Sequence, residues 1–515
     1  MKAVRLYMTN AASSVATRVL QITVLVWVNQ YLLRRIEPAE YSIFPVVLSL
    51  MIFADVVKYL ITGGIGRFLV EADSRGDQAG VTRIVSSMFP VVLLAALFFA
   101  TAGGLAAWRI DDLLQIQPAY LHQARVMLLL LTFSLCLSVI TAPFVDGLYV
   151  RQRFVIGNVI DLGTEALRIA ILLALLFGVS TRVTWLVVAS ACAAAVNIGI
   201  RVVLTRQWIP AVTFRRNSIS GDTVKTLLRF GGWTSLQGIT ALISGAAPTL
   251  LLNRFGTALD VTAFYLGRLP DIHIRSMAGA ASSPAQPAMT SIFAKQGAVP
   301  LRDLYYRGGR YFLWVTLPLV APLLIFGRQI VSLYAGAQYA PAATVIFWLL
   351  AFYPFIWASA MFFQVAHAIG RIGAFYACDA IVQAVTLLAL WYAVSSRGLG
   401  AAGAAMGIGL AGGILHVVLI WPMGLRLVEG RWSIFARQTL LPGLLPFASA
   451  CVACYVFSLG VEVNSWPMIA SACVLSLAVY CVVLLVWCLD LVDRDVAARI
   501  AHRFLTLPAR SVRVS

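Results

Sequence analysis

Residues 262–289 read TAFYLGRLPDIHIRSMAGAASSPAQPAM, and this stretch decides how the chain is built. Most of its side chains are apolar, and a helix of this length is long enough to cross the roughly 30 Å of hydrocarbon in a bilayer. Charged residues, a histidine and prolines nevertheless interrupt it: Arg268, Asp271, His273, Arg275, Pro284 and Pro287. Whether this segment spans a membrane fixes the orientation of everything that follows it.

The composition of the whole chain places it in a membrane. Of its 515 residues, 61% are hydrophobic and 12% are charged, and the mean hydropathy is +0.88. This is more apolar surface than a soluble fold can bury. The apolar stretch Ala11–Leu33 has no small-residue cleavage site after it, so we expect a retained first span and not a signal peptide. The sequence therefore predicts an all-α polytopic membrane protein.

Apolar stretches long enough to span a bilayer occur fourteen times along the chain. Segment 262–289 is the eighth of them. The predicted spans lie near residues 11–33, 41–62, 84–107, 121–143, 157–178, 183–205, 228–252, 262–289, 311–333, 342–366, 374–395, 401–425, 439–460 and 466–489.

The distribution of basic residues indicates that the eighth segment crosses. With fourteen spans and the N-terminus inside, 26 Lys and Arg residues fall in cytoplasmic segments and 7 fall on the opposite side. This is the bias expected of cytoplasmic loops. Without the eighth span, the thirteen basic residues from Lys295 onward would lie outside. We therefore predict that both termini are cytoplasmic, with short external loops.

The longest internal linker divides the predicted spans into two lobes. We expect the following organisation: an N-lobe at 1–205 with spans 1–6, a cytoplasmic linker at 206–227, a C-lobe at 228–425 with spans 7–12, extra spans 13 and 14 at 439–489, and a cytoplasmic tail at 490–515.

The two lobes carry an internal repeat. Because an even number of spans separates the copies, both insert with the same orientation. The sequence thus predicts two six-helix repeats related by a pseudo-twofold axis along the membrane normal, plus two extra C-terminal helices. The matches are Tyr120 to Phe133 with Tyr339 to Phe352; Arg5, Asn29 and Tyr41 with Arg229, Asn253 and Tyr265; and Arg153, Asp161 and Glu165 with Arg371, Asp379 and Gln383.

Several ionisable residues fall inside predicted spans, where they are costly and are expected to face a partner or a wet cavity. Asp55 and Lys58 share one helical face of span 2, and the spacing of Arg268, Asp271 and Arg275 places them on one face of span 8. Spans 2 and 8 are near equivalents in the repeat, so both faces are predicted to look into a cleft between the lobes. The predicted substrate-binding residues of this cationic cavity are Arg18, Lys58, Arg268 and Arg275.

The intramembrane carboxylates form a second predicted set, with a role in gating or ion coupling: Asp55, Asp161, Glu165, Asp271 and Asp379. For Asp161, Glu165 and Arg168 on span 5, an internal salt-bridge network is an equally good interpretation, because their spacing allows self-neutralisation and Asp161 lies within reach of Arg153. His367 and His416 stand alone on apolar helices and are interpreted as ordinary buried histidines.

Other kinds of site are not indicated. The sequence shows no catalytic, metal-binding or cofactor motif, so we predict a protein that is not an enzyme and uses no cofactor. Its basic residues are scattered through short loops, which argues against nucleic-acid binding. All eight cysteines lie in apolar segments, where thiols behave as small hydrophobic groups.

These features together resemble one family. Beyond the 6 + 6 + 2 arrangement of spans, local agreement comes from the loop Gly66 to Asp77, the run GLYVRQRF at Gly147 to Phe154, and AIGR at Ala368 to Arg371. The chain resembles the polysaccharide-lipid flippases of the multidrug/oligosaccharidyl-lipid/polysaccharide exporter superfamily. The resemblance covers the whole chain, but its motifs are loose and identify a superfamily better than a substrate.

The resemblance implies a function. A flippase of this kind moves an undecaprenyl-pyrophosphate-linked oligosaccharide from the cytoplasmic to the periplasmic leaflet of the bacterial inner membrane, by alternating access, for surface polysaccharide biosynthesis. It implies four kinds of partner: the lipid-linked glycan, membrane lipids, a coupling ion (H⁺ or Na⁺) and glycan-assembly proteins. Spans 13 and 14 are expected to help form a groove for the polyprenyl tail.

Two other functions compete with this one. A drug/cation antiporter of the same superfamily is expected to have an acidic cavity, which Arg18, Lys58, Arg268 and Arg275 disfavour. An integral-membrane glycan polymerase or ligase typically needs a large external loop with catalytic basic residues, and the external loops predicted here are short.

Overall fold

The computed structural model describes residues 26–151, 153–282, 289, 292–293, 297, 299–490 and 493–494. These residues are helical apart from turns and short connections and include no β-strand, which confirms the predicted all-α class. Arg18 and most of predicted span 1 lie outside the described residues. Residues 26–33 of this span are helical.

Ten helical segments of the described chain are long and apolar enough to cross a membrane, so the protein is a multi-pass membrane protein. Three further helices of 25 residues each coincide with predicted spans 5, 7 and 8: α8 (Phe154–Gly178), α10 (Gly221–Gly245) and α12 (Ala258–Ser282). The count of fourteen stays a prediction. The ten segments are Pro38–Ser74, Gln78–Trp108, Pro118–Val150, Thr184–Trp208, Pro300–Tyr334, Pro341–Ile369, Phe375–Ser396, Gly400–Leu427, Trp432–Gly460 and Trp466–Cys488.

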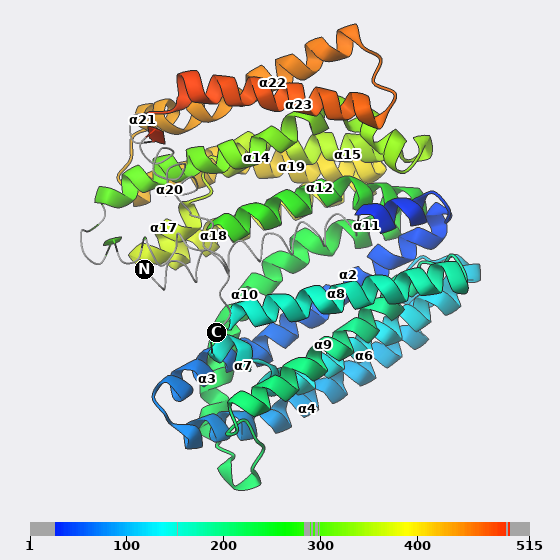
Figure 1. The fold of residues 1–515 in the computed structure, drawn as a ribbon, viewed down its shortest axis with the longest axis vertical. Coiled ribbons are helices and arrows are strands. Elements are labelled where there is room, and N and C mark those ends of the chain that lie inside the picture. The colour runs from blue at the N-terminus through cyan, green and yellow to red at the C-terminus, as the bar shows by residue number, and fades with distance from the viewer. Residues whose placement is uncertain are drawn as a thin grey trace, which may run out of the picture. The chain divides into compact units, whose positions relative to one another are not determined.

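The chain divides into two compact units, of which unit 1 comprises Met1–Leu266 and Leu387–Ala404. Within it α4, α6 and α9 pack side by side, and α8 packs against α9 (Figure 1). The elements of unit 1 besides α8 and α10 are α2 (Pro38–Thr62), α3 (Ile65–Ser74), α4 (Gln78–Trp108), α5 (Ile110–Leu113), η1 (Pro118–Tyr120), α6 (Leu121–Val145), α7 (Gly147–Val150), α9 (Thr184–Trp208), η2 (Arg216–Ser218), α11 (Ala247–Phe255), the first part of α12, and η4 (Tyr392–Ser396).

Unit 2 comprises Gly267–Thr386 and Ala405–Ser515. Its longest helix, α14 (Val299–Tyr334), packs against α22 and α23, which lie side by side (Figure 1). The other elements are the rest of α12, η3 (Ala337–Tyr339), α15 (Pro341–Leu350), α16 (Tyr353–Trp357), α17 (Phe362–Ile369), α18 (Ile372–Trp391, which ends in unit 1), α19 (Gly400–Leu415, which begins there), η5 (His416–Ile420), α20 (Trp421–Leu427), α21 (Trp432–Phe435), η6 (Ala436–Leu440), α22 (Leu441–Gly460), α23 (Trp466–Val483) and η7 (Leu484–Cys488).

The helices are long because a bilayer offers no water to the backbone, so each N–H and C=O must be paired within the helix. Prolines inside α2, α4, α6, α12, α14 and α22 are therefore tolerated, as is common in membrane helices. Where α4 begins in a polar loop, Asp77 caps it and accepts a hydrogen bond from the Gly80 N–H at 2.7 Å.

The linker between α9 and α10 is packed and well anchored. It is irregular only over residues 209–220, apart from the short η2, so predicted linker 206–227 includes helical turns at both ends. Hydroxyl groups of α4 hold it: Thr82 donates to the Ala211 carbonyl at 2.8 Å, and Ser86 and Ser87 accept from the N–H groups of Arg215 and Ser220 at 2.9 Å each.

Residues separated by the predicted repeat offset touch each other in unit 1. The Thr262 hydroxyl donates to the carbonyl of Pro38, 224 residues earlier, at 3.1 Å. Tyr41 and Tyr265, which have the same separation, have ring centroids 6.2 Å apart. Equivalent residues meet in this way at a twofold axis, so these contacts support the predicted repeat.

The compact units and the predicted lobes are divided differently. α10, α11 and the first turns of α12 belong to unit 1, although the repeat assigns them to the second copy. The lobes are defined by sequence equivalence and the units by packing, and the lobe boundaries stay a prediction.

Candidate substrate site

Asp271 and Arg275 lie one turn apart on α12 and form an ion pair. The Arg275 Nε donates to Oδ1 of Asp271 at 2.7 Å. The Tyr353 hydroxyl, at the start of α16, donates to the same oxygen at 2.5 Å, and the guanidinium lies 5.5 Å from the centre of the Tyr353 ring. The Asp271 side chain is only 7% exposed, whereas that of Arg275 is 46% exposed. The carboxylate is thus enclosed, and it holds in place a guanidinium that stays accessible.

Arg275 lines a cavity of about 260 Å³ in unit 2. Residues of α12, α14, α16 to α18 and η5 surround it. Five aromatic rings contribute to the wall: Phe312, Trp357, Phe362, Phe363 and Phe375. Its polar side chains are Arg275, Ser359, Gln364, Asp379 and His416. The cavity therefore combines flat apolar surfaces with hydrogen-bonding and charged groups.

Two residues predicted from the sequence come together in this cavity, Arg275 and Asp379. Gln383, one turn further along α18, donates to Oδ1 of Asp379 at 3.4 Å. Arg268 is partly buried on α12 before Asp271, and it does not line the cavity. Its predicted role in binding substrate stays a prediction.

The aromatic wall is preorganised. Phe312 and Trp357 stack with ring centroids 5.6 Å apart and an interplanar angle of 8°, and Phe363 packs edge-on against Phe375 at 5.0 Å. Rings that already pack against one another need little ordering when a ligand binds.

His416 also lines this cavity. Its Nδ1 lies 2.7 Å from the Gly412 carbonyl oxygen, and it begins η5, one of four π-helical turns in the described residues. Its interpretation as an ordinary buried histidine stays a prediction.

Asp55 and Lys58 lie in unit 1, both partly buried on α2. Among the ion pairs of the described residues, neither takes part in one. Their predicted roles in ion coupling and substrate binding stay predictions.

Asp161, on α8, lies in a polar cluster with residues of α9. Arg201 donates to Oδ1 of Asp161 at 2.7 Å, and the Asn197 amide donates to the same oxygen at 3.0 Å. The predicted partner, Arg153, lies elsewhere: its guanidinium is 5.0 Å from the centre of the Trp208 ring. Among the ion pairs of the described residues, Asp161 therefore pairs with Arg201 of α9 and not with Arg153, which the sequence had placed within its reach.

Glu165 and Arg168 pair with each other on α8. The guanidinium donates twice to the carboxylate, at 3.0 and 2.5 Å, and both side chains are largely enclosed. The i, i+3 spacing allows this self-neutralisation, and the structure shows the pair. The predicted role of Glu165 in gating or ion coupling stays a prediction.

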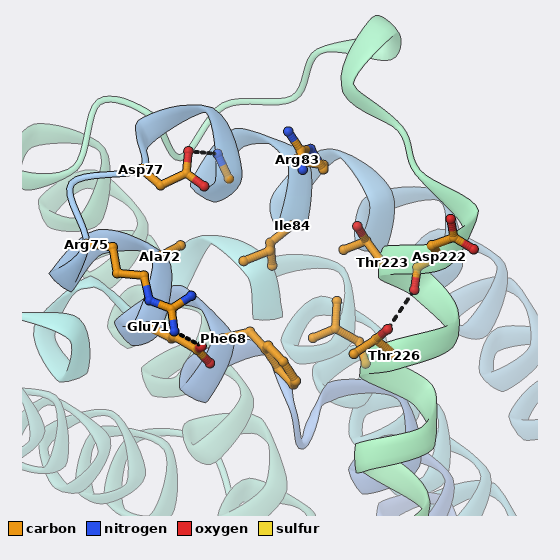
Figure 2. A pocket seen from close by; sticks show the side chains of 12 residues that line it. Phe68, Glu71, Ala72, Arg75, Asp77, Arg83, Ile84, Asp222, Thr223 and Thr226 are labelled. Carbon is orange, nitrogen blue, oxygen red and sulfur yellow. Dashed lines mark hydrogen bonds and ion pairs between the residues drawn. The ribbon is translucent and has the colours of Figure 1, made fainter.

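A second cavity, of about 320 Å³, lies in unit 1 between α3, α4 and α10 (Figure 2). Its charged groups are largely satisfied locally: Arg75 pairs with Glu71 at 2.8 Å, and Asp77 caps α4. Figure 2 shows Arg83 and Asp222 extending from α4 and α10 at its rim. Because three of its charged groups, Glu71, Arg75 and Asp77, already have local partners, it is a weaker candidate than the cavity of unit 2.

A family described as polysaccharide biosynthesis protein matches residues 32–344, more than half of the chain. The chain belongs to this family. A curated relative is the uncharacterized membrane protein EpsK of Bacillus subtilis (strain 168), which is 22% identical over 479 residues, 89% of this chain and 90% of that protein.

The fold of this polysaccharide biosynthesis protein is also similar to the folds of other proteins whose structures are solved. The chain is similar to the lipid II flippase MurJ in an inward closed conformation, with a TM-score of 0.67, 12% identity, and coverage of 96% of this chain and 100% of that one. It is similar to an inward-facing MATE family transporter of the MOP superfamily, with a TM-score of 0.65, 14% identity, and coverage of 81% and 98%. These likenesses show that the chain shares its fold with a lipid II flippase and a MATE family transporter.

Proposed function

We propose that this protein is a flippase that moves an undecaprenyl-pyrophosphate-linked oligosaccharide from the cytoplasmic to the periplasmic leaflet of the bacterial inner membrane, for surface polysaccharide biosynthesis. Family membership supports a role in making polysaccharide, and the fold is shared with a lipid II flippase. Transport by alternating access, with both termini in the cytoplasm, is part of the proposal.

The observation that carries the proposal is the accessible Arg275 guanidinium within an apolar helical unit. A guanidinium has five N–H donors, and Asp271 takes one of them. The others can donate to the oxygens of a pyrophosphate, for which a planar fork is well suited. The aromatic and polar walls of the same cavity fit the apolar faces and hydroxyl groups of a sugar.

This geometry favours a flippase over a drug/cation antiporter. Asp271, the carboxylate beside Arg275, is enclosed and occupied by two donors, so it does not present its charge to a cationic ligand. Arg18, Lys58 and Arg268 are proposed as further cations of the transport path.

The proposal is tested with purified protein in liposomes that contain the lipid-linked oligosaccharide with a fluorophore on its sugar. An impermeant reductant added outside first quenches the fluorophores that already lie in the outer leaflet. The slower quenching that follows measures the rate at which fluorophores arrive from the inner leaflet. Wild-type protein is expected to accelerate it over protein-free liposomes. No acceleration with several lipid-linked glycans would contradict the proposed function.

Substitutions at Arg275 tie the activity to the cavity. Arg275→Ala is expected to lower the translocation rate by more than about tenfold, because losing one partner of a desolvated charged contact costs about 2–5 kcal/mol. Arg275→Lys keeps the charge but loses the fork, and partial activity is expected. The matched control is Arg328→Ala, an exposed arginine of α14 outside the cavity. Equal rates for Arg275→Ala and Arg328→Ala would exclude Arg275 as a substrate ligand.

A further inference from the structure

Two charged side chains of the cavity in unit 1 are still available to a ligand, Arg83 of α4 and Asp222 of α10. Neither takes part in an ion pair among the described residues, and both residues are exposed. Figure 2 shows them at the rim of the cavity, near the starts of two different helices. The cavity thus offers one cationic and one anionic group from separate walls.

The other charged groups of this cavity compensate one another. Asp77 caps the N-terminus of α4, where a carboxylate is stabilised by the backbone N–H groups. Glu71 and Arg75 pair at 2.8 Å, but their side chains are 42% and 72% exposed. An exposed pair of this kind is weak, so the Arg75 guanidinium can also donate to an anion bound in the cavity.

The walls of the cavity are held in place. Ser87 of α4 accepts a hydrogen bond at 2.9 Å from the N–H of Ser220, which directly precedes α10. Phe68 of α3 packs edge-on against Phe230 of α10, with ring centroids 5.8 Å apart. Three buried apolar residues also line the cavity: Ala72, Ile84 and Leu227. A fixed apolar surface beneath a charged rim suits an amphipathic ligand.

The cavity lies where apolar helices give way to polar loops. Its lining residues fall within 68–84 and 222–227, whereas predicted span 2 ends at residue 62, span 3 begins at 84 and span 7 begins at 228. With fourteen spans, these three ends lie on the same side of the membrane. Positions just outside the hydrocarbon are level with the lipid headgroups, and basic pockets at this level bind headgroup phosphates. A phospholipid is therefore the phosphate compound with the highest local concentration.

We propose that the cavity of unit 1 binds the headgroup of a phospholipid that carries both a phosphate and a primary ammonium, as phosphatidylethanolamine does. The Arg83 guanidinium donates to the phosphate oxygens, and Arg75 provides further donors. The Asp222 carboxylate accepts hydrogen bonds from the ammonium, and the buried apolar residues contact the glycerol and the first carbons of the acyl chains.

The carboxylate of Asp222 decides between kinds of headgroup. A purely anionic headgroup leaves Asp222 without a counter-ion, and the trimethylammonium of choline has no N–H to donate. The inference goes beyond the proposed transport function, and its test does not depend on transport.

Binding is measured by native mass spectrometry of the full-length protein with added phosphatidylethanolamine, phosphatidylglycerol or phosphatidylcholine of identical acyl chains. The relative intensities of free and lipid-bound protein give the apparent Kd of the first bound lipid. We expect phosphatidylethanolamine to bind more tightly than the other two. Equal affinities of the wild type for phosphatidylethanolamine and phosphatidylglycerol would overturn the proposal.

Substitutions separate the two ends of the headgroup. Arg83→Ala is expected to weaken the binding of phosphatidylethanolamine and phosphatidylglycerol alike by about fivefold, the contribution of one basic residue at this level. Asp222→Asn is expected to weaken phosphatidylethanolamine by about two- to fivefold without weakening phosphatidylglycerol. Both residues are exposed, so neither change disturbs the packing of the helices.

The matched controls are Arg216→Ala and Asp112→Asn, which change exposed charged residues outside the cavity and are expected to leave lipid binding unchanged. Wild-type affinity for phosphatidylethanolamine in Arg83→Ala would overturn the proposal. Soluble glycerophosphoethanolamine carries the same headgroup without acyl chains. If it displaces the lipid at equal concentration, the occupant is a soluble phosphate compound and the proposed lipid site is wrong.

Discussion

Each unit contains an arginine–aspartate pair within its long helices, Arg201–Asp161 in unit 1 and Arg275–Asp271 in unit 2, and these two pairs are arranged in opposite ways. In the Asp161 cluster (Asp161, Thr164, Asn197 and Arg201), the arginine donates to Asn197 as well as to Asp161, and the carboxylate is the more exposed partner, 42% against 25%. In the Asp271 cluster (Asp271, Arg275 and Tyr353), the carboxylate is enclosed and the arginine is exposed.

Residue types alone therefore do not determine which partner of an intramembrane ion pair stays accessible. Both carboxylates accept hydrogen bonds from two donors, so the pairs differ in which partner stays accessible. In the Asp161 cluster the more exposed partner is the carboxylate, whereas in the Asp271 cluster it is the guanidinium, which can therefore meet an anion.

The largest effect is expected for Asp271→Asn. The substitution leaves the Arg275 charge without its enclosed counter-ion, and breaking such a pair typically costs about 3–5 kcal/mol. We expect a large fall in the unfolding temperature of the protein in detergent. Asp111→Asn is the control, because Asp111 is half exposed and lies 3.6 Å from Arg125. Similar unfolding temperatures for the two variants would contradict the anchoring role of Asp271.

A smaller effect is expected for Tyr353→Phe. It removes one hydrogen bond to a charged group, which is worth about 1.5–3 kcal/mol, but keeps the ring beside the Arg275 guanidinium. Translocation is expected to fall while the protein still inserts, because Asp271 loses a donor that fixes its position. Full translocation activity in this variant would show that Arg275 does not depend on Tyr353 for its placement.

The smallest effect is expected for Asp161→Asn, about 1 kcal/mol or less, because its carboxylate is partly exposed and an amide can still accept from Arg201. Glu71→Gln, in the exposed pair with Arg75, provides the baseline of a surface ion pair. Equal falls in the unfolding temperature for Asp161→Asn and Asp271→Asn would contradict the proposed difference between the two clusters.

Much of this arrangement follows from the sequence. Long apolar stretches predict membrane helices, since nothing else pairs every backbone group in lipid, and the spacing of Glu165 and Arg168 predicts their pairing. Residues close together on one helix can be judged from the sequence, because helix geometry fixes their distance.

Contacts between helices were harder to predict. Arg201 reaches Asp161 from a helix 40 residues away, and Tyr353 lies 82 residues beyond Asp271. Asp161 pairs with Arg201 and not with Arg153 because of how α8 and α9 pack. The spacing of residues along one helix does not reveal this packing. The place of His416 in the cavity could not be predicted either, because a lone histidine on an apolar helix gives no sign of which helices pack around it.

The contact between Thr262 and Pro38 has a consequence for the history of the molecule. In a symmetric dimer, a residue on the twofold axis meets its own copy from the other subunit. Positions 224 residues apart that now touch within one chain are what remains when two such subunits become joined. A half-length ancestor that assembled as a parallel homodimer, with this same patch pressed against itself, would account for the contact, and gene fusion would then have freed each half to acquire a different charged cluster.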